Sequence, residues 1–195
     1  VQAEYACRNV IFAIGHSARD TFYMLHEREL SMNPKAFAIG VRVEHLAHLI
    51  NESQYGRNAD MTLLPTAAYK VTHQSSNGRG VYSFCMCPGG YVVNASSEEG
   101  RLAVNGMSYR SRDSKNANSA IIISVTPEDF PKPDHPLSGV VFQRKLEEAA
   151  WKLAEGKVPQ QLYADFKENK KSTGYGSFES CIKGQHAFAN LRTLF

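Results

Sequence analysis

A segment with four prolines, residues 127–136, divides this sequence into two parts with different residue patterns. Before it, short runs of β-branched and aromatic residues alternate with glycine-containing turns, a pattern typical of β-strands. After it, apolar residues recur every three or four positions over residues 137–154, as in a helix that packs one face on a core. The sequence therefore predicts one α+β unit, with an antiparallel or mixed β-sheet meander in the first two thirds and a helical last third.

The predicted strands are short apolar runs. A continuous apolar run at 9–14 is typical of a buried strand. Residues 80–86 and 91–93 are predicted to form a β-hairpin that reverses at Pro88-Gly89-Gly90. The remaining strands are predicted at 36–44, 67–73 and 120–125.

The predicted helices follow from apolar periodicity and from residues that favour helix ends. Ser17 can act as the N-cap of a first helix, and residues 45–50 predict a short helical turn. The long helix at 137–154 ends before Gly156, and two further helices are predicted at 160–168 and 185–195.

Composition restricts the class of protein. The 195 residues are 43% hydrophobic and 21% charged, as in ordinary globular proteins, and no apolar stretch is long enough for a membrane span. A formal net charge of +3 without a dense basic run argues against a nucleic-acid partner. Four cysteines are too few for a disulfide framework and no secretory signal is present, so we expect a reducing cytoplasm.

Residues 78–118 form the stretch in which a ligand site is most expected, and they contain the closely spaced pair Cys85 and Cys87. Positions two apart in a strand share a face, which places Phe84 and Met86 on the other. Zinc sites need a second ligand pair that this sequence lacks, so no metal site is predicted. The thiols are interpreted as buried and unreactive, with a ligand-lining role as the alternative.

The loop that follows carries cations and amides. Arg110, Arg112, Asn116 and Asn118 can bind a phosphate, a carboxylate or a planar heterocycle, and Arg42 is a further candidate from the strand at 36–44. The alternative is a solvated loop with no specific ligand. The predicted strand at 120–125 favours an ordered loop, because it would hold one end of the loop in place.

A glycine turn follows the first apolar run. Gly15 and His16 separate the predicted strand at 9–14 from the first helix, and such a turn lets backbone N–H groups approach a cofactor or phosphate. One glycine is weak evidence, and His16 can equally well bond to a backbone carbonyl.

The run at 78–90 ends in Cys-Met-Cys-Pro-Gly-Gly, and further blocks of note lie at 10–21, 37–45, 104–108, 116–120 and 139–144. These blocks resemble a family of uncharacterised bacterial FAD-dependent dehydrogenases, and the run at 78–90 is the most specific of them. The resemblance implies a flavoprotein whose FAD occupies a Rossmann-like domain interrupted by a second domain, with hydride transfer at flavin N5.

One part of the family pattern is missing. No Gly-x-Gly-x-x-Gly motif, whose glycines let the backbone approach a pyrophosphate, occurs in these residues. The resemblance therefore implies that residues 1–35 are a remnant of the flavin domain and that 36–195 are an inserted substrate or cap domain. FAD would belong to the full-length parent, would not bind tightly to this fragment alone, and would be held by a partner domain of the same chain.

Under this interpretation Arg110, Arg112, Asn116, Asn118 and Arg42 contact the substrate or the flavin ring, and Gly15 and His16 border the flavin. Cys85 and Cys87 are additional contact candidates, while the substrate itself is not specified. Two alternatives stay open: a stand-alone module that binds a small molecule or RNA through the basic loop, and a structural oligomerisation domain.

Overall fold

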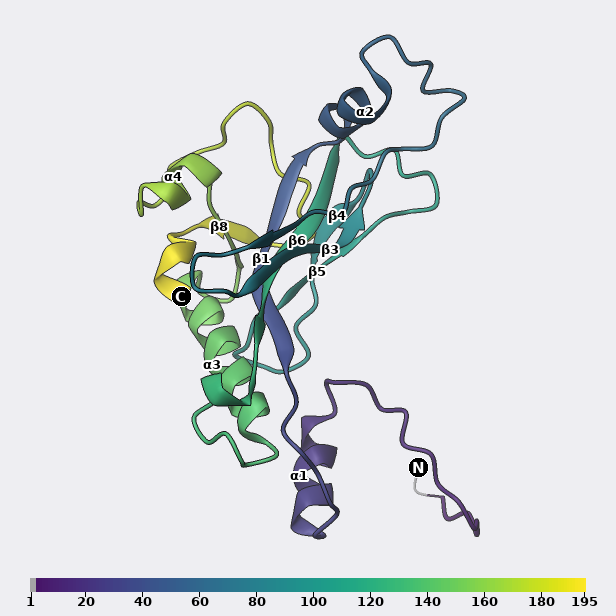
Figure 1. Cartoon of the computed structure of the whole chain (residues 1–195), viewed down its shortest axis with the longest axis vertical. Coiled ribbons are helices and arrows are strands. Elements are labelled where there is room, and N and C mark those ends of the chain that lie inside the picture. The colour runs from purple at the N-terminus through teal and green to yellow at the C-terminus, as the bar shows by residue number, and fades with distance from the viewer. Residues whose placement is uncertain (1–2) are drawn as a thin grey trace.

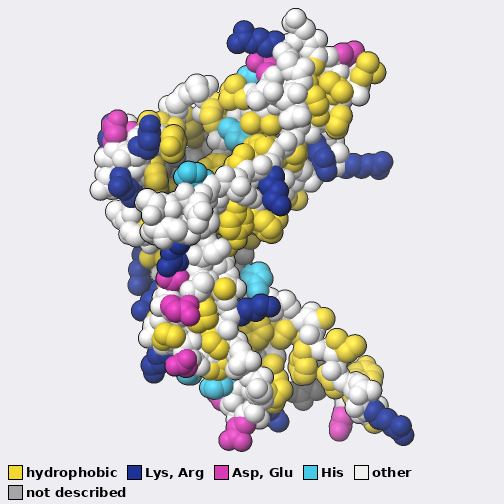
Figure 2. Space-filling model, viewed as in Figure 1, with side chains coloured by type: hydrophobic (Ala, Val, Ile, Leu, Met, Phe, Trp, Pro, Cys, Tyr) yellow, Lys and Arg dark blue, Asp and Glu magenta, His cyan; other side chains and the backbone are white. Residues whose placement is uncertain are grey.

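The computed structural model describes residues 3–195 and shows an elongated α+β molecule (Figure 1). The β-sheet occupies the middle and α3 (Ser138–Leu153) runs alongside it. Helix α2 (Ala47–Tyr55) caps one end, and α1 (Arg19–Glu27) with the N-terminal segment extends from the other. The space-filling view shows a notch between the body of the molecule and this N-terminal part (Figure 2). The predicted mixture of helices and antiparallel sheets is confirmed.

The elements follow the chain in this order. The helices are α1 (Arg19–Glu27), α2 (Ala47–Tyr55), α3 (Ser138–Leu153) and α4 (Tyr163–Lys167), with 3-10 helices η1 (Pro127–Asp129) and η2 (Leu191–Leu194). The strands are β1 (Phe37–Leu46), β2 (Thr72–Gln74), β3 (Gly80–Cys87), β4 (Tyr91–Asn94), β5 (Val104–Met107), β6 (Asn116–Val125), β7 (Val158–Gln160) and β8 (His186–Phe188). Among residues 3–195, no helix has the length and apolar character needed to cross a bilayer.

The central sheet has the strand order β1-β6-β3-β2, with every neighbouring pair antiparallel. Strand β1 pairs with β6 along its whole length, from Phe37 opposite Val125 to Leu46 opposite Asn116. Strand β6 begins at Asn116, four residues before the predicted strand at 120–125, so Asn116 and Asn118 lie in the sheet and not in a loop. At the other edge, β2 is shorter than the strand predicted at 67–73.

The predicted hairpin at 80–93 is wrong. Strand β3 pairs with β2 and β6, whereas β4 pairs with β5 in a separate two-stranded sheet. The reversal at Gly89 explains the error, because Gly89 has φ +51° and lies so close to the Arg112 backbone that a side chain there would overlap it. After this turn, β4 therefore leads away from β3 and does not pair with it as the second strand of a hairpin would.

A β-bulge interrupts β3 at the cysteine pair. Pairing with β6 passes from Phe84 opposite Ala120 to Cys87 opposite Asn118, so two residues of β3 face one of β6. Cys85 adopts φ +46° within this bulge and is exposed, while Cys87 is half-buried. The interpretation of both thiols as buried is therefore wrong. Because the bulge breaks the alternation of side chains along β3, spacing alone does not tell which face of the sheet Cys85 and Cys87 occupy.

The last third of the chain is only partly helical. Helix α3 agrees with the helix predicted at 137–154, and the shorter α4 lies within the one predicted at 160–168. The final helix predicted at 185–195 is wrong, because β8 and η2 occupy this segment and β8 pairs in parallel with β7. The apolar core between these elements is small, with Leu102, Ala150 and Val158 at its centre.

The first apolar run is not a buried strand. Residues 10–14 have no regular secondary structure and no strand partner among the described residues, and Ile11 is 91% exposed. Helix α1 then begins at Arg19, with Ala18 as N-cap, and the predicted cap Ser17 makes no capping bond. An apolar run becomes a buried strand only where it pairs with a sheet, and residues 10–14 pair with none of the sheets in the described residues.

Candidate functional site

Arg42 of β1 lies at the centre of a cluster that joins three strands. Its Nε donates to Asn118 Oδ1 at 2.7 Å, and its Nη2 donates to the Cys85 carbonyl oxygen at 2.5 Å and lies 3.4 Å from Cys87 Sγ. Within residues 3–195 the guanidinium forms no ion pair with a carboxylate. The cluster therefore carries a positive charge that only neutral groups surround.

Asn118 leaves one polar atom of this cluster free. The residue is 0% exposed, and its Nδ2 has no hydrogen-bond partner among the described residues. A buried amide donor without a partner costs free energy, and such groups often mark places where a ligand or water binds. Gly106 of β5 packs directly on the pair, because a Cβ there would overlap Arg42 Nη2 and Asn118 Oδ1.

A cleft of about 960 Å³ opens beside this cluster. Its walls come from the β3 bulge, from β5 with the loop that follows, and from the loop after α2; they include Cys85, Cys87, Gly106, Arg110, Arg112 and Leu64. Arg110 and Arg112 are exposed at the cleft, and neither forms an ion pair within residues 3–195. The structure thus brings Arg42, Asn118, both cysteines and two loop arginines of the predicted set into one region.

Asn116 belongs to a different cluster. Its Nδ2 donates to Glu44 Oε1 and to the Glu179 carbonyl oxygen, both at 2.9 Å. The Glu44 carboxylate also accepts from Ser180 Oγ at 2.5 Å and from the Cys181 backbone N–H at 2.6 Å. Asn116 therefore ties the C-terminal segment to β1 and β6.

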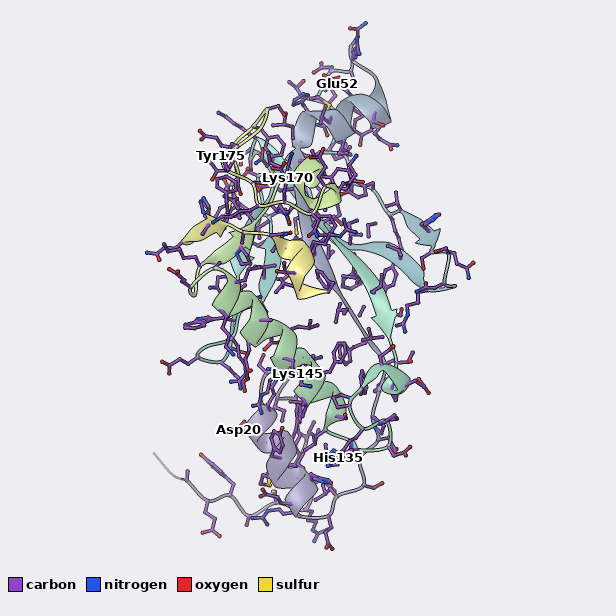
Figure 3. All side chains as sticks on the ribbon, turned by 90° about the vertical axis from the view of Figure 1, so that its left-hand side faces the viewer. Asp20, Glu52, His135, Lys145, Lys170 and Tyr175 are labelled. Carbon is purple, nitrogen blue, oxygen red and sulfur yellow. The ribbon has the colours of Figure 1, made fainter. Side chains whose placement is uncertain are left out.

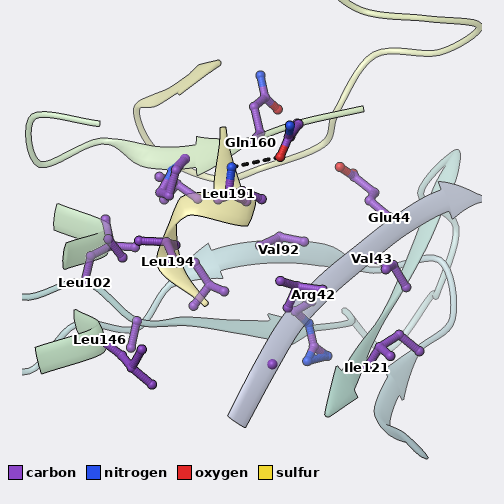
Figure 4. A pocket seen from close by; sticks show the side chains of 18 of the residues that line it. Arg42, Val43, Glu44, Val92, Leu102, Ile121, Leu146, Gln160, Leu191 and Leu194 are labelled. Atoms are coloured by element: carbon purple, nitrogen blue, oxygen red, sulfur yellow. Dashed lines mark hydrogen bonds between the residues drawn. The ribbon is translucent and has the colours of Figure 1, made fainter. Parts of the chain in front are cut away.

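The other two predicted residues lie near a second cavity, which Arg42 also lines. His16 lines an apolar cavity of about 760 Å³ between β1, α3 and the C-terminal segment (Figure 4). Its Nε2 lies 3.4 Å from Ser17 Oγ. Gly15 has φ +70° and open space around it, so it makes no close approach to another part of the described chain.

Comparison with known families identifies residues 36–195 with a family model described as "FAD-dependent protein, C-terminal domain-like". The chain belongs to this family. It is also 51% identical over 189 residues to an uncharacterised protein of Clostridium beijerinckii, an alignment that covers 95% of this chain and 35% of that protein. The chain thus spans about a third of that relative's length and represents a domain of an FAD-dependent protein family.

Within the family domain, no group of three or more histidine, cysteine, aspartate or glutamate side chains in residues 3–195 is arranged to hold a metal ion. The polar chemistry of the described cleft is therefore that of arginine, amide and thiol groups. These groups donate hydrogen bonds and attract anions or electron-rich oxygen atoms.

An ion-pair network that the sequence did not reveal joins the family domain to α1. Arg19 donates to Glu98 Oε2 at 2.9 Å and to Glu147 at 2.7 and 2.8 Å, and Arg144 donates to Glu98 at 2.5 and 3.1 Å. The Arg144 and Arg19 guanidinium groups lower the pKa of Glu98 to about 2. Figure 3 shows α1, with Asp20, beside the part of α3 that carries Lys145.

No sequence signal could have found this network as a whole. Arg144 and Glu147 are neighbours on one helix, but their partners lie in α1 and in the loop after β4, far away along the chain. The Arg42 cluster was partly predictable because its members are of types that bind ligands, whereas their mutual contacts depend on the bulge and the strand register.

Proposed function

We propose that this chain is the cap or substrate domain of an FAD-dependent oxidoreductase, and that the Arg42 cleft faces the flavin and substrate. The observation that supports this most is the uncompensated Arg42 guanidinium beside the unpartnered Asn118 amide, next to a cleft in a family domain of FAD-dependent proteins. Both groups are placed to bind an electron-rich oxygen that the described chain does not supply.

The cluster fits one part of the cofactor. A cation and an amide donor suit the electron-rich edge of an isoalloxazine ring or a substrate carboxylate, and charge near the ring tunes flavin reactivity. When bound, FAD would supply hydride transfer. The chain lacks a Gly-x-Gly-x-x-Gly motif, so we expect another part of the full-length protein to hold the pyrophosphate and this fragment alone to be inactive.

Each group of the cleft has a proposed task. Arg42 and Asn118, which contact the wall residues Cys87 and Gly106 from behind, orient the electron-rich group. The exposed Arg110 and Arg112 in the wall attract an anionic substrate from solvent. Closure of the cleft over the ring would exclude water. Cys85 and Cys87 lie in the wall of the cleft and contact the ligand. We also propose a cytoplasmic location, with which four free thiols are in keeping.

The N-terminal segment supports the proposed division of the chain. The family model covers 36–195, and the exposed apolar residues 10–14 precede it. We propose that residues 1–35 belong to the flavin-binding domain, with α1 docked on the family domain through Arg19 and the apolar run at 10–14 packed in the flavin-binding domain, where it would find the strand partner that it lacks here.

Charge removal in the full-length protein tests the cleft. We expect Arg110→Ala with Arg112→Ala to raise the KM for an anionic substrate at least ten-fold and to leave the folding midpoint unchanged. The control is Arg57→Ala, whose side chain is 89% exposed and lies outside the cleft. If the double variant keeps both the flavin spectrum and the turnover of the native protein, the arginines have no role in the site.

A second experiment tests whether FAD is held by another part of the full-length protein. Residues 1–195 purified alone should be colourless, and the full-length protein should show the flavin absorbance bands. Stoichiometric, tightly held FAD on residues 1–195 would show that this segment grips the cofactor by itself and would contradict the cap assignment.

A further inference from the structure

The apolar cavity between β1, α3 and the C-terminal segment shares Arg42 with the cleft. Arg42 itself lines this cavity, whereas the cleft is lined by groups that Arg42 contacts, such as Cys87. The volume of about 760 Å³ lies in the range of small-molecule binding sites. In Figure 4, β1 forms one side, and Leu102, Leu146 and Leu194 face it from the other. The walls are mostly apolar, so the few charged groups among them decide which ligand can bind.

Arg42 has hydrogen-bond donors to spare for this cavity. Its Nε donates to Asn118, and its Nη2 donates to the Cys85 carbonyl oxygen and lies near the Cys87 thiol. Its Nη1 donates to no group within residues 3–195 and is not fully buried, and Arg42 lines the cavity but not the cleft. A guanidinium has five N–H groups, so the two on Nη1 can bind a carboxylate that enters the cavity.

Glu44 presents the opposite charge to the same cavity. It follows Arg42 by two positions in β1, so both side chains leave the same face of the strand. Its Oε1 accepts from Asn116 and Cys181, and its Oε2 accepts from Ser180. Two carboxylate oxygens offer about four acceptor sites, so one site on Oε2 is unused. In the part of the chain that the structure describes, no cation forms an ion pair with Glu44.

The other charges in the cavity wall cancel. Arg19 and Glu147 both line the cavity, and they form an ion pair at 2.7 Å. Among the arginine and glutamate side chains of the wall, this leaves the positive charge of Arg42 and the negative charge of Glu44. An ion of either sign would pair with one of these groups and be repelled by the other, and a neutral ligand would pair with neither. A zwitterion pairs with both.

The spacing along β1 suits an α-amino acid, which carries its carboxylate and its ammonium group on one carbon. Residues two apart in an extended strand have Cα atoms about 6.6 Å apart. With a hydrogen bond of about 3 Å at each end, such a molecule can contact both side chains. Gln160 also lines the cavity, and its Oε1 accepts no hydrogen bond within residues 3–195, so it offers the ammonium group a further acceptor.

We propose that this cavity binds a free α-amino acid with a large apolar side chain, such as phenylalanine. The carboxylate pairs with Arg42 Nη1 and the ammonium group with Glu44 Oε2, while the side chain replaces water against Leu102, Leu146 and Leu194. This site goes beyond the proposed function, because its ligand lies in the cavity and not in the cleft. The two sites are linked, because both use the charge of Arg42.

Isothermal titration calorimetry of the full-length protein tests the site. We expect saturable binding of L- or D-phenylalanine, with one molecule per chain. Three compounds each lack one recognised part: 3-phenylpropionate lacks the ammonium group, 2-phenylethylamine lacks the carboxylate, and alanine lacks the ring. Each should bind at least ten-fold more weakly, because each loses a charged hydrogen bond or the buried ring. Equal affinity for any of the three, or no saturable binding of either enantiomer, would overturn the proposal.

Glu44→Gln separates recognition from a purely structural role. The variant keeps the shape of the side chain and removes its charge, so phenylalanine should bind at least ten-fold more weakly. The affinity for 3-phenylpropionate, which has no ammonium group, should not fall. An equal loss for both compounds would mean that Glu44 only supports the cavity wall, and it would overturn the assignment of the ammonium group to this carboxylate.

Cavity-filling variants test the location. Leu146→Trp, which fills the cavity from α3, should weaken phenylalanine binding at least ten-fold. The matched control is Val141→Trp on the same helix, because Val141 is 39% exposed and does not line the cavity; it should bind as the native protein does. Ile39→Trp fills the cavity from β1 and takes its place if Leu146→Trp does not fold. Native affinity in a folded cavity-filling variant would overturn the proposal.

The amino-acid site and the flavin role fail separately, because binding is measured as heat and FAD by its absorbance. A full-length protein that shows flavin absorbance and binds no phenylalanine would overturn the amino-acid site alone. A colourless full-length protein that binds phenylalanine would support the amino-acid site and overturn the flavin role.

Discussion

Two arginines of this chain have opposite surroundings. Arg19 of α1 is buried and donates to two carboxylates, Glu98 and Glu147, so its charge is neutralised inside the molecule. Arg42 of β1 donates to an amide oxygen, a carbonyl oxygen and a thiol, and no carboxylate pairs with it within residues 3–195. The first arrangement holds elements together, whereas the second leaves charge available for a ligand.

The difference shows how to separate structural from functional cations in one fold. Removing one partner of a buried arginine–carboxylate pair destabilises the fold, because it leaves an uncompensated buried charge. An arginine that is held by neutral groups keeps an uncompensated positive charge, and its electrostatic potential acts on a ligand in the neighbouring cleft. Variants at the two positions should therefore affect different observables.

The largest effect is expected at Arg19. Arg19→Met removes the cation that Glu98 and Glu147 share and leaves partly buried carboxylates, so the free energy of unfolding should fall by about 3 kcal/mol. Urea unfolding followed by circular dichroism measures the change. Arg57→Met, at an exposed arginine, is the control and should unfold at the native midpoint. Equal midpoints for the two variants would remove the contrast between the arginines.

Gly106→Ala should disturb the Arg42 cluster by overpacking. The added Cβ would overlap Arg42 Nη2 and Asn118 Oδ1, so the guanidinium must move, at a cost of about 2 kcal/mol. Thermal unfolding measures the loss. The control Gly80→Ala lies in β3 with open space at its Cβ and should change the midpoint far less. A native midpoint for Gly106→Ala would mean that the cluster adapts freely.

Arg42→Met should sharpen the comparison by changing function more than stability. It removes hydrogen bonds to Asn118 and Cys85 but leaves no carboxylate without its cation. We therefore expect the free energy of unfolding to fall by about 1 kcal/mol. In the full-length protein, substrate or flavin affinity should fall at least ten-fold, as read by kcat/KM and by the flavin spectrum. A stability loss as large as that of Arg19→Met, with unchanged affinity, would make Arg42 a structural residue.

The smallest of the expected effects on stability is the weakening of the Arg19 network by acid. The pKa of Glu98 is about 2 in the folded state, below its ordinary value of 4.5, so its contribution is fully present above pH 4.5 and is lost as pH falls toward 2. The effect is modest because the Glu98 side chain is partly solvated. Urea midpoints measured between pH 6 and 3 should fall less in Glu98→Gln than in the native protein. Parallel profiles would exclude a role for this carboxyl.

The sequence predicted the elements whose signals are local. Helix α3 and strand β1 follow directly from apolar spacing, and their observed bounds differ little from the predicted ones. The predicted hairpin failed because a turn sequence says that the chain reverses but not which strand it will meet. The strand predicted at 9–14 failed for a related reason, since apolar residues favour a buried strand but do not provide the neighbouring strand, and residues 10–14 pair with none in the described chain.

Residue type alone thus marked Arg42, Asn118, Cys85 and Cys87 as groups that can bind a ligand, because arginine, amide and thiol chemistry is fixed by covalent structure. Only the tertiary structure decided that Arg42 touches Asn118 and the cysteines, that Asn116 bonds to Glu44, and that Arg19 is neutralised. The physical reason is that charge compensation is a property of neighbours in space. Strand register, the β3 bulge and the docking of α1 choose those neighbours from residues far apart in the chain.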